Sequence, residues 1–504
     1  MNQRSPVRRF VGLAAAALVS ALAPATFGSG EPQESFVYQN FVRASQVLDR
    51  AVAAHGGTEL LDRAVTVRLS FTGLFRAEGH YPRPWAYRDY RLDGATIYST
   101  DLRAVKSSVT VYEKDEPSPS FTIAGTANGV RLSIWGSRPE PIAEKDLESS
   151  MREELEILPH EYLRQARAGA AGLRLLPGAK GYDVLTYALD DGQTRALYFD
   201  AKTHLLMRVE RIDHWKHKGD RLEWRTFSRY VDKSGIKVPL HSEVHVENGS
   251  TQRNVVSELS KIEFGAALIA DEFTIPEKSR AGFEEWTLEK PAAGDPDELL
   301  PTHDLGQGVY IIDLPASTAR SLLVAFSDFA VVVEAGDYSG ISARLLATAD
   351  HLMPDKPVRY VAMTHHHPLY ANGLRPYVQR GITVLATAGN VSYFRDLTTR
   401  PYRIRPDAQQ RQSREPKVEV IDGSRIIEDG VQRLELHEFD YSTHTDEFVL
   451  PYLPSHKLIV TGDAVYILRD AELRPARSRE LAVHRVVKER NLDVSIASEN
   501  GRSL

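Results

Sequence analysis

Hydrophobic and polar positions alternate along most of the chain between residues 60 and 275. Val65, Val67 and Leu69 are apolar while the residues between them are polar, a period of two that places the apolar side chains on one face of a strand. Such stretches recur through this half of the chain, and repeated alternation is typical of antiparallel sheets with one solvated side. The pattern predicts an antiparallel β domain with short helices over residues 35–279.

Turn sequences divide these stretches into hairpins. In 183–212 the sequences DDGQ and DAKTH separate three strands, and in 229–249 a Ser-Gly pair marks a two-residue turn. Helical spacing interrupts the strands at 46–56 and 144–158. This combination resembles the curved-sheet folds of lipoprotein carriers, and the resemblance implies a concave face that holds acyl chains.

The alternation ends at residues 280–301, a segment rich in proline, glycine and charge that predicts a linker between two domains. Strands that then alternate with helices predict a layered α/β domain over residues 302–504. Functional sites in such domains form where loops leave the carboxyl ends of the strands. The predicted elements after the linker are short apolar strands and one helix, at 308–314, 321–326, 329–336, 342–353 and 357–363.

The first residues of the chain predict an export signal. Arg4, Arg8 and Arg9 precede the apolar run FVGLAAAALVSALA, and small-residue sites for a signal peptidase follow it. We therefore expect residues 1–25 to be a signal peptide and the protein to be exported, either periplasmic or secreted. The paired arginines also resemble a twin-arginine signal. The apolar run is shorter than the roughly 20 residues that span a bilayer, so stable membrane insertion is not expected.

Composition narrows the choice of partner and of metal ligand. The 504 residues include 62 Lys and Arg against 68 Asp and Glu, a formal net charge of -6 without a long basic run, which argues against nucleic acid as a partner. The chain contains no cysteine, so disulfides, thiolate ligands and a cysteine nucleophile are all excluded. Histidine, of which there are 17, and carboxylate are left to hold any metal ion.

One loop after a predicted strand contains the sequence THHHPLYANG. His365 and His367 in it are two residues apart, so in an extended loop their imidazoles project to the same side, as two ligands of one metal ion must. His444, in DYSTHTDEF, and Asp463, which follows an apolar strand, are candidates for further ligands. Taken singly, each of these residues would also be explained as solvated surface or as part of a turn.

The order and spacing of these segments resemble the metallo-β-lactamase superfamily. The resemblance covers residues 302–504, from the opening strand GVYIIDL through the histidine triplet, STHTDEF and TGD to the closing LDVSIASENGR. It implies an αββα sandwich with the site at the edge between two sheets. It also implies that three histidines of a first metal site correspond to His365, His367 and His444, and that a carboxylate shared between two metal sites corresponds to Asp463.

The same resemblance implies that a second metal site has been lost. The family places an aspartate, a histidine and a further histidine where this chain has Leu369, Tyr370 and Asn500. Leucine cannot coordinate a metal, asparagine has no charge, and the tyrosine hydroxyl titrates at about 10, so it is a poor zinc ligand at neutral pH. We therefore expect one metal ion, with zinc as the first choice.

Three neutral imidazoles with an open position form a site that lowers the pKa of a zinc-bound water to about 7. The sequence thus predicts an exported hydrolase that uses one zinc ion and acts on a small-molecule substrate. The substrate could be apolar, because the concave face of the first domain would accommodate an apolar molecule. Asp463 would complete the coordination or accept a hydrogen bond from the water, and Tyr370 would donate one to a developing oxyanion. Neither the identity of the substrate nor the oligomeric state is encoded in a recognisable motif.

Two other functions remain open from the sequence. The family also contains mononuclear iron dioxygenases, whose two histidines and one carboxylate would correspond to His365, His444 and Asp463, with iron in place of zinc. Loss of the second site would also fit a non-catalytic binding protein on a decayed hydrolase scaffold. Loss confined to one site favours adaptation to a single metal ion, because decay is expected to strike both sites.

Other histidines have simpler explanations. His241, Glu243 and His245 share one face of a predicted strand, where a metal site is conceivable but the polar face of an antiparallel sheet is the better interpretation. His214 and His217, in DHWKHKGD, are predicted to lie in a solvated loop. The chain contains no glycine-rich phosphate loop and no nucleophile-elbow motif, so nucleotide binding and serine hydrolysis are not indicated.

Overall fold

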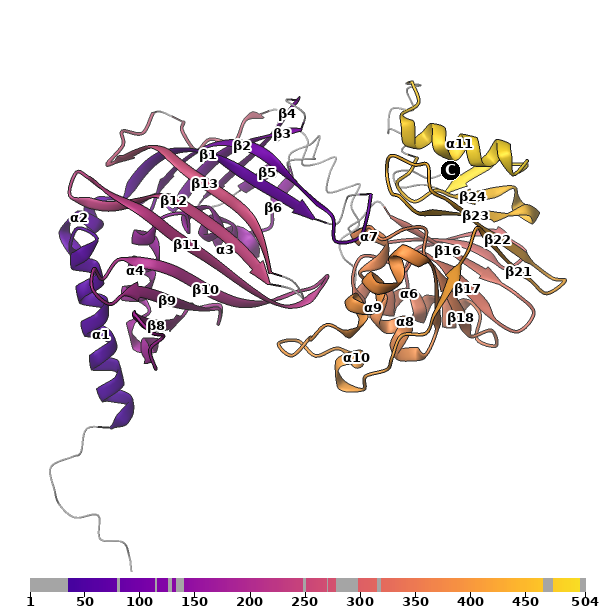
Figure 1. The fold of residues 1–504 in the computed structure, drawn as a ribbon, viewed down its shortest axis with the longest axis horizontal. Helices are drawn as coiled ribbons and strands as arrows, with labels where there is room; N and C mark the ends of the chain where they lie inside the picture. The colour runs from indigo at the N-terminus through magenta and orange to yellow at the C-terminus, as the bar shows by residue number, and fades with distance from the viewer. Residues whose placement is uncertain are drawn as a thin grey trace, which may run out of the picture.

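The structure is a computed structural model with three β-sheets and the helices packed on them (Figure 1). A 13-stranded sheet belongs to the first part of the chain, and a seven-stranded and a five-stranded sheet belong to the second. The predicted signal peptide and most of the predicted linker lie outside the described residues, and none of the described helices is long and apolar enough to cross a membrane. The described residues are 35–78, 82–113, 116–125, 129–132, 140–247, 251–269, 271–277, 298–314, 319–465 and 475–498.

The first sheet is antiparallel and consists of two consecutive meanders, β1 to β6 and β7 to β13, joined where β1 pairs with β13. Figure 1 shows it as a strongly curved sheet, drawn from indigo to magenta. Its strands are β1 (Thr66–Glu78), β2 (Tyr87–Ser99), β3 (Ala104–Glu113), β4 (Glu116–Gly125), β5 (Gly129–Leu132), β6 (Glu140–Ile142), β7 (Arg174–Leu176), β8 (Tyr182–Ala188), β9 (Thr194–Asp200), β10 (Leu206–Trp215), β11 (Gly219–Lys233), β12 (Ile236–Glu247) and β13 (Thr251–Phe264).

Helices pack against this sheet through apolar stripes. The first helix begins after Ser35, whose hydroxyl accepts a hydrogen bond from the third residue of the helix, and it buries Ala44, Leu48 and other residues at helical spacing. Leu163 of a later helix joins the same core. The helices of this part are α1 (Phe36–Ala54), α2 (Thr58–Arg63), α3 (Glu144–Leu155), α4 (Pro159–Ala168) and the 3-10 turn η1 (Ala170–Gly172).

Most of the predicted local structure is found here. The three strands predicted in 183–212 are β8, β9 and β10, and the predicted Ser-Gly turn joins β11 to β12. The helix predicted at 46–56 is the second half of α1, which starts ten residues earlier. The segment predicted at 144–158 is helical only to Leu155, because Pro159 starts a separate helix there.

The second part of the chain contains two smaller sheets. The first is antiparallel from β14 to β17 and parallel from β17 to β20, and only β24 and β25 are parallel in the other. The strands are β14 (Thr302–Gly306), β15 (Val309–Asp313), β16 (Arg320–Ala325), β17 (Ala330–Val333), β18 (Val358–Ala362), β19 (Thr383–Thr387), β20 (Val418–Ile421), β21 (Ser424–Glu428), β22 (Arg433–Phe439), β23 (Phe448–Leu453), β24 (Leu458–Val460) and β25 (Ile496–Ser498).

These two sheets face each other, and helices cover their outer sides. Val331 of β17 and Leu436 of β22 belong to one apolar cluster between the sheets, whereas Val332 points the other way and packs with Leu345. Val483 covers the outer side of β23. The layers are therefore helix, sheet, sheet, helix. The helices are α6 (Ser339–Leu352), α7 (Pro368–Ala371), α8 (Arg375–Arg380), α9 (Val391–Thr399), α10 (Ala408–Arg411) and α11 (Ser478–Glu489), with 3-10 turns η2 (Ala388–Asn390) and η3 (Pro454–His456).

Candidate metal site

Three loops at the carboxyl ends of strands bring the candidate metal ligands together. His365 and His367 follow β18, His444 lies between β22 and β23, and Asp463 follows β24. The histidine triplet stays extended because α7 begins only at Pro368, and proline is favourable at the first position of a helix. The edge of the two sheets therefore holds all four side chains, as the sequence predicts for a site at strand ends.

The four side chains converge on one point. Asp463 Oδ1 lies 2.9 Å from His365 Nε2 and 2.7 Å from His444 Nε2, and Asp463 Oδ2 lies 3.4 Å from His367 Nδ1. One nitrogen or oxygen from each residue lies within 4.8 Å of the corresponding atoms of the other three. Across the described ranges, this is the one group of three or more histidines and carboxylates with such spacing.

Burial sets the charge of these groups. It lowers the pKa of His365 to about 4 and that of His367 to about 3, although the Asp463 carboxylate acts in the opposite direction. Burial also opposes ionisation of Asp463, but the neighbouring imidazoles hold the pKa of its carboxyl well below its usual range. At neutral pH the site therefore offers two neutral buried imidazoles and an ionised carboxylate, the protonation states that a divalent metal requires of its ligands.

A hydrogen-bond chain behind His365 orients its ring. The Thr364 hydroxyl lies 2.7 Å from His365 Nδ1 and donates to a carboxyl oxygen of Glu334. When Nδ1–H donates to Thr364, Nε2 is left unprotonated and faces Asp463, where it can ligate a metal ion. Glu334 was not predicted as a site residue, although a glutamate directly after the apolar run AVVV was a signal for it.

The environment of Glu334 is unusual for a carboxyl group. It is completely buried, and burial raises its pKa to about 8, with a smaller contribution from the Asp463 charge. Its backbone has φ 71, in a region that costs a residue with a side chain on the order of 1–3 kcal/mol. Both features are typical of functional sites, so Glu334 belongs to the candidate metal site as the residue that orients Thr364 and His365.

Two of the three positions where the family resemblance implies lost ligands are occupied by core residues. Tyr370 is 1% exposed and belongs to the apolar cluster beneath α6, and Leu369 packs against the same cluster. The ring of Tyr370 lies 5.0 Å from that of His365, between centroids, so it borders the metal site. Asn500 lies outside the described residues.

A cavity of about 540 Å³ opens beside the loop that contains His444. One of its walls comes from the β1–β2 loop of the first sheet, where the Pro82 carbonyl accepts the Asp446 N–H at 2.7 Å. The Trp85 ring contacts Tyr393 at 5.0 Å between centroids, and Tyr393 contacts His366 at 6.0 Å. Residues of the β1–β2 loop thus lie beside the loop that contains His444 and, through Tyr393, near His366. The cavity is lined by Pro82, Arg83, Pro84, Trp85, Gly389, Asn390, Asp440, Asp446 and Glu447.

Among the described residues, the remaining histidines form no such cluster. His241, Glu243 and His245 lie along β12, and Glu243 lies 3.2 and 3.0 Å from the two imidazoles, as expected of a polar sheet face. The prediction of a solvated loop for His214 and His217 is wrong. The hairpin that contains them packs on the second part of the chain: His217 Nδ1 lies 2.8 Å from the Asp337 carbonyl oxygen, and the His214 ring packs on a tyrosine of that part.

No protein-family model matches the chain, and no curated protein sequence matches it significantly. Solved structures do resemble part of it. A metallo-β-lactamase from Pontibacter korlensis is 20% identical, with 40% of this chain and 92% of that chain covered and a TM-score of 0.31. The metallo-β-lactamase FIM-1 from Pseudomonas aeruginosa, in its mono-zinc form, is 17% identical over 41% of this chain and 90% of that chain, with a TM-score of 0.31.

The stereoselective inverting sec-alkylsulfatase Pisa1 from Pseudomonas sp. is 14% identical, with 42% of each chain covered and a TM-score of 0.30. Several of the matches are metallo-β-lactamases that cover about 40% of this chain, in agreement with the resemblance predicted from its sequence. At such identities and TM-scores the likeness concerns the fold alone. The chemistry of the candidate site rests on its own geometry.

Proposed function

We propose that this chain is a hydrolase that uses one metal ion, with zinc as the first choice, held by His365, His367 and His444. The observation that supports this proposal most directly is the convergence of the three imidazoles on the carboxylate of Asp463, with all four ligand atoms within 4.8 Å of one another. Neutral imidazole and carboxylate are the donors that zinc accepts where cysteine is absent.

His365, His367 and His444 would hold the zinc ion, which would lower the pKa of a bound water to about 7 and so supply a nucleophile at neutral pH. The side chains around the site would orient the water and stabilise the charge that develops on the substrate. Because the pKa of Asp463 lies well below its usual range, its carboxylate is a weak base, and we assign it the role of orienting the water through a hydrogen bond. Tyr370, which borders His365, would donate a hydrogen bond to the oxyanion that develops on the substrate.

The core residues of α7 support a site for one ion rather than two. Leu369 and Tyr370 fill apolar positions, so this side of the site offers no carboxylate or imidazole to a second ion. One ion is sufficient for hydrolysis when it activates water and the surrounding residues stabilise the charge of the transition state.

The cavity beside His444 is our proposed entrance for a small-molecule substrate. Asp440, Asp446 and Glu447 line it, and the single arginine among the lining residues, Arg83, is already paired with Asp446. This balance of charge favours a neutral or cationic substrate over an anionic one. The proposed signal peptide would place the reaction outside the cytoplasm.

Metal content tests the proposal directly. Protein from zinc-supplemented expression should retain about one equivalent of zinc, and His367→Ala should retain far less, because two imidazoles hold the ion weakly. His351→Ala is the matched control, since it changes an exposed histidine in the last turn of α6. A wild-type protein without metal would refute the hydrolase and favour a binding protein, and iron in place of zinc would favour a dioxygenase.

Activity is the second test. A panel of p-nitrophenyl esters, bis(p-nitrophenyl) phosphate and a chromogenic β-lactam covers the main classes of hydrolysable bond. Hydrolysis of at least one of them should disappear after treatment with a chelator and return with added zinc, and His367→Ala should not recover it. Activity that survives complete removal of metal would contradict the proposed mechanism.

A further inference from the structure

The curved first sheet contains two cavities of opposite chemistry that lie next to each other, remote from the candidate metal ligands in the sequence. One cavity, of about 320 Å³, is lined by charged side chains, and the other, of about 230 Å³, is mostly apolar. Arg225 and Glu153 line both, so the cavities adjoin there. The apolar cavity is lined by Phe71, Phe75, Leu92, Val109, Val111 and Val255.

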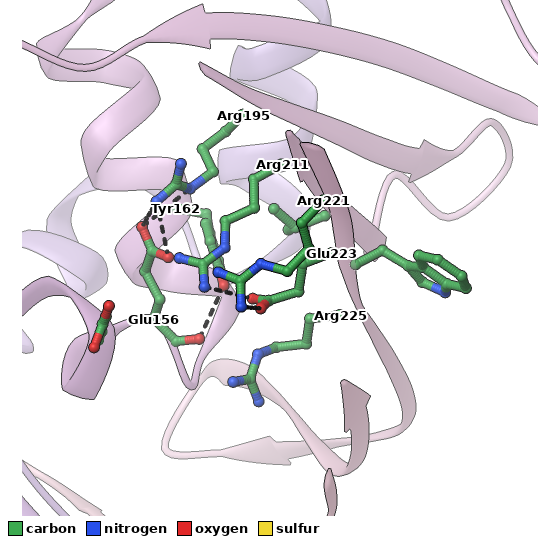
Figure 2. Close-up of a pocket in the computed structure, with 10 residues that line it drawn as sticks. Glu156, Tyr162, Arg195, Arg211, Arg221, Glu223 and Arg225 are labelled. Atoms are coloured by element: carbon green, nitrogen blue, oxygen red, sulfur yellow. Dashed lines mark hydrogen bonds and ion pairs between the residues drawn. The ribbon is translucent and has the colours of Figure 1, made fainter. Parts of the chain in front are cut away.

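Most cations of the charged cavity already have a carboxylate partner. Arg195 donates to both oxygens of Glu156 at 3.0 to 3.2 Å. Arg211 lies 2.8 Å from Glu223. Arg221 makes a bidentate pair with an aspartate of β10, at 2.9 and 2.6 Å. Figure 2 shows the pairs of Arg195 with Glu156 and of Arg211 with Glu223 in the cavity.

Arg225 is the exception. In the part of the chain that the structure describes, it makes no ion pair, and it donates one long hydrogen bond, of 3.4 Å, to the Ser242 hydroxyl. Figure 2 shows its guanidinium apart from the paired arginines, with no dashed line to them or to their carboxylates. A half-buried guanidinium has up to five N–H donors, so Arg225 has most of its donors left for an anion.

The register of the sheet places this cation in line with a row of apolar residues on β12, β13 and β1. Arg225 on β11 pairs with Val244 on β12, Val244 pairs with Val255 on β13, and Val255 pairs with Phe75 on β1. Directly paired residues of antiparallel strands point to the same face. The guanidinium of Arg225 and the apolar residues that line the second cavity therefore lie side by side on the same face of the sheet.

The acidic residues nearby do not compete for Arg225. Glu153, which lines both cavities, lies 3.6 Å from the guanidinium of Arg131. Glu154 lines the apolar cavity. Burial raises the pKa of its carboxyl, and this effect is larger than the opposite effect of the hydrogen bonds with Ser107 and Thr122, so the neutral form is favoured. Glu153 is thus already paired, and the raised pKa of Glu154 weakens its repulsion of an anion at Arg225.

We propose that these cavities bind a single-chain amphiphile with an anionic head group, a carboxylate or a sulfate, with the head at Arg225 and the alkyl chain against Phe75 and Val255. An engineered apolar cavity of about 150 Å³ accommodates benzene, so the larger apolar cavity accepts a short alkyl chain. This binding site is independent of the proposed hydrolase, because its residues belong to the first sheet and to the helices packed on it.

Calorimetric titration of the full-length protein with defined amphiphiles, below their micellar concentrations, tests the proposal. Decanoate and decyl sulfate should bind, whereas decyltrimethylammonium should bind at least tenfold more weakly, because its head carries the opposite charge. From hexanoate to decanoate the affinity should rise by about fourfold for each methylene that becomes buried. A difference between decanoate and decyl sulfate identifies the preferred head group.

Substitutions of Arg225 test whether the head group binds at this residue. Arg225→Gln should weaken decanoate binding roughly 10- to 100-fold, since a hydrogen-bonded charge is lost, while Arg225→Lys should retain much of the affinity. Arg103→Gln, which changes an exposed arginine paired with Glu148, is the control and should bind as wild type does. Each variant is first compared with wild type by its thermal unfolding, and Arg225→Lys covers the case in which Arg225→Gln fails to fold.

Three results would overturn the inference. The first is a wild-type protein that binds none of these amphiphiles. The second is equal binding of decanoate and decyltrimethylammonium, or unchanged binding in Arg225→Gln, because either would exclude recognition of the anion. The third is binding of acetate as tight as that of decanoate, which would exclude the apolar half of the site.

Discussion

The tip of the β10–β11 hairpin is held against the second part of the chain, and its closest approach requires glycine. Gly219 has φ +85, and a Cβ atom there would lie 2.3 Å from the carbonyl oxygen of Pro401. The N–H of Asp220 donates to that oxygen at 2.9 Å. The Asp220 carboxylate accepts from the N–H groups of Arg403 and Ile404 at 2.7 and 3.1 Å. We therefore predict that Gly219→Ala detaches the hairpin.

The size of the effect follows from these contacts. An alanine with left-handed φ costs roughly 1–2 kcal/mol. Loss of three hydrogen bonds, two of them to a carboxylate, adds on the order of 5 kcal/mol. Gly192 provides the matched control, because it lies in the β8–β9 turn at φ +80 with nothing within 4 Å of a Cβ atom. Gly192→Ala introduces the backbone strain alone. The difference in the free energy of unfolding between the two variants therefore measures the contribution of the hairpin contact.

Limited digestion with trypsin measures the detachment. Lys218 is 4% exposed at the hairpin tip, so cleavage after it should be slow in the wild-type protein. Cleavage should be fast in Gly219→Ala and remain slow in Gly192→Ala. Calorimetry of Gly219→Ala should also show a less cooperative unfolding transition, because one of the contacts between the two parts is lost. Equal cleavage rates in both variants would refute the reasoning that this contact joins the two parts.

Three shorter predictions concern the candidate site and the two cores. Tyr370→Phe keeps the packing of the ring, so zinc content should not change while kcat on the best chromogenic substrate falls roughly 100- to 1000-fold; an unchanged kcat would exclude the hydroxyl from catalysis. Glu156→Gln leaves a buried arginine without its partner and should cost about 3–5 kcal/mol in urea unfolding, whereas the exposed Glu59→Gln should cost under about 1 kcal/mol, and equal costs would contradict the role of burial. Because the pKa values of His365 and His367 fall from 6.5 to about 4 and about 3, the unfolded chain binds more protons than the folded one below pH 6.5. Metal-free protein should therefore lose up to about 1.4 kcal/mol per pH unit for each of them as the pH falls from 6.5 to 4, and a flat urea midpoint over this range would contradict it.

Strand pairing within each meander was predictable because it is local. The turn at Ser234–Gly235 joins two alternating stretches, so the hairpin follows from a few neighbouring residues. The start of α1 was not predictable in the same way. Phe36, Val37 and Tyr38 are 76%, 55% and 53% exposed, so the first turn of the helix presents large apolar side chains to solvent. The apolar residues of this turn therefore do not mark the buried face of the helix, and amphipathic spacing does not reveal where the helix starts.

The candidate metal ligands were predictable from residue type and order, but their supporting residues were not. His365, His444 and Asp463 are separated by many residues, and the resemblance to a known family joined them. Glu334 carries no such motif, since its role depends on a contact with Thr364 that the chain makes across 30 residues. Long-range contacts of this kind depend on how strands β17 and β18 pair, which alternation alone does not specify.

The charged cavity shows what the alternation of residues leaves open about the concave face. Alternation separates two faces of a strand but does not say which one is covered. On β10 the side chain of Arg211 is 18% exposed, while the neighbouring Ile212 is 60% exposed, the reverse of the usual polarity. On the inward face Glu156, at the end of α3, pairs with Arg195 of β9, and Arg211 pairs with Glu223 of β11, so both inward arginines have a carboxylate partner. A helix packed from elsewhere in the chain thus decides that the concave face of this sheet is charged on one side of Arg225 and apolar on the other.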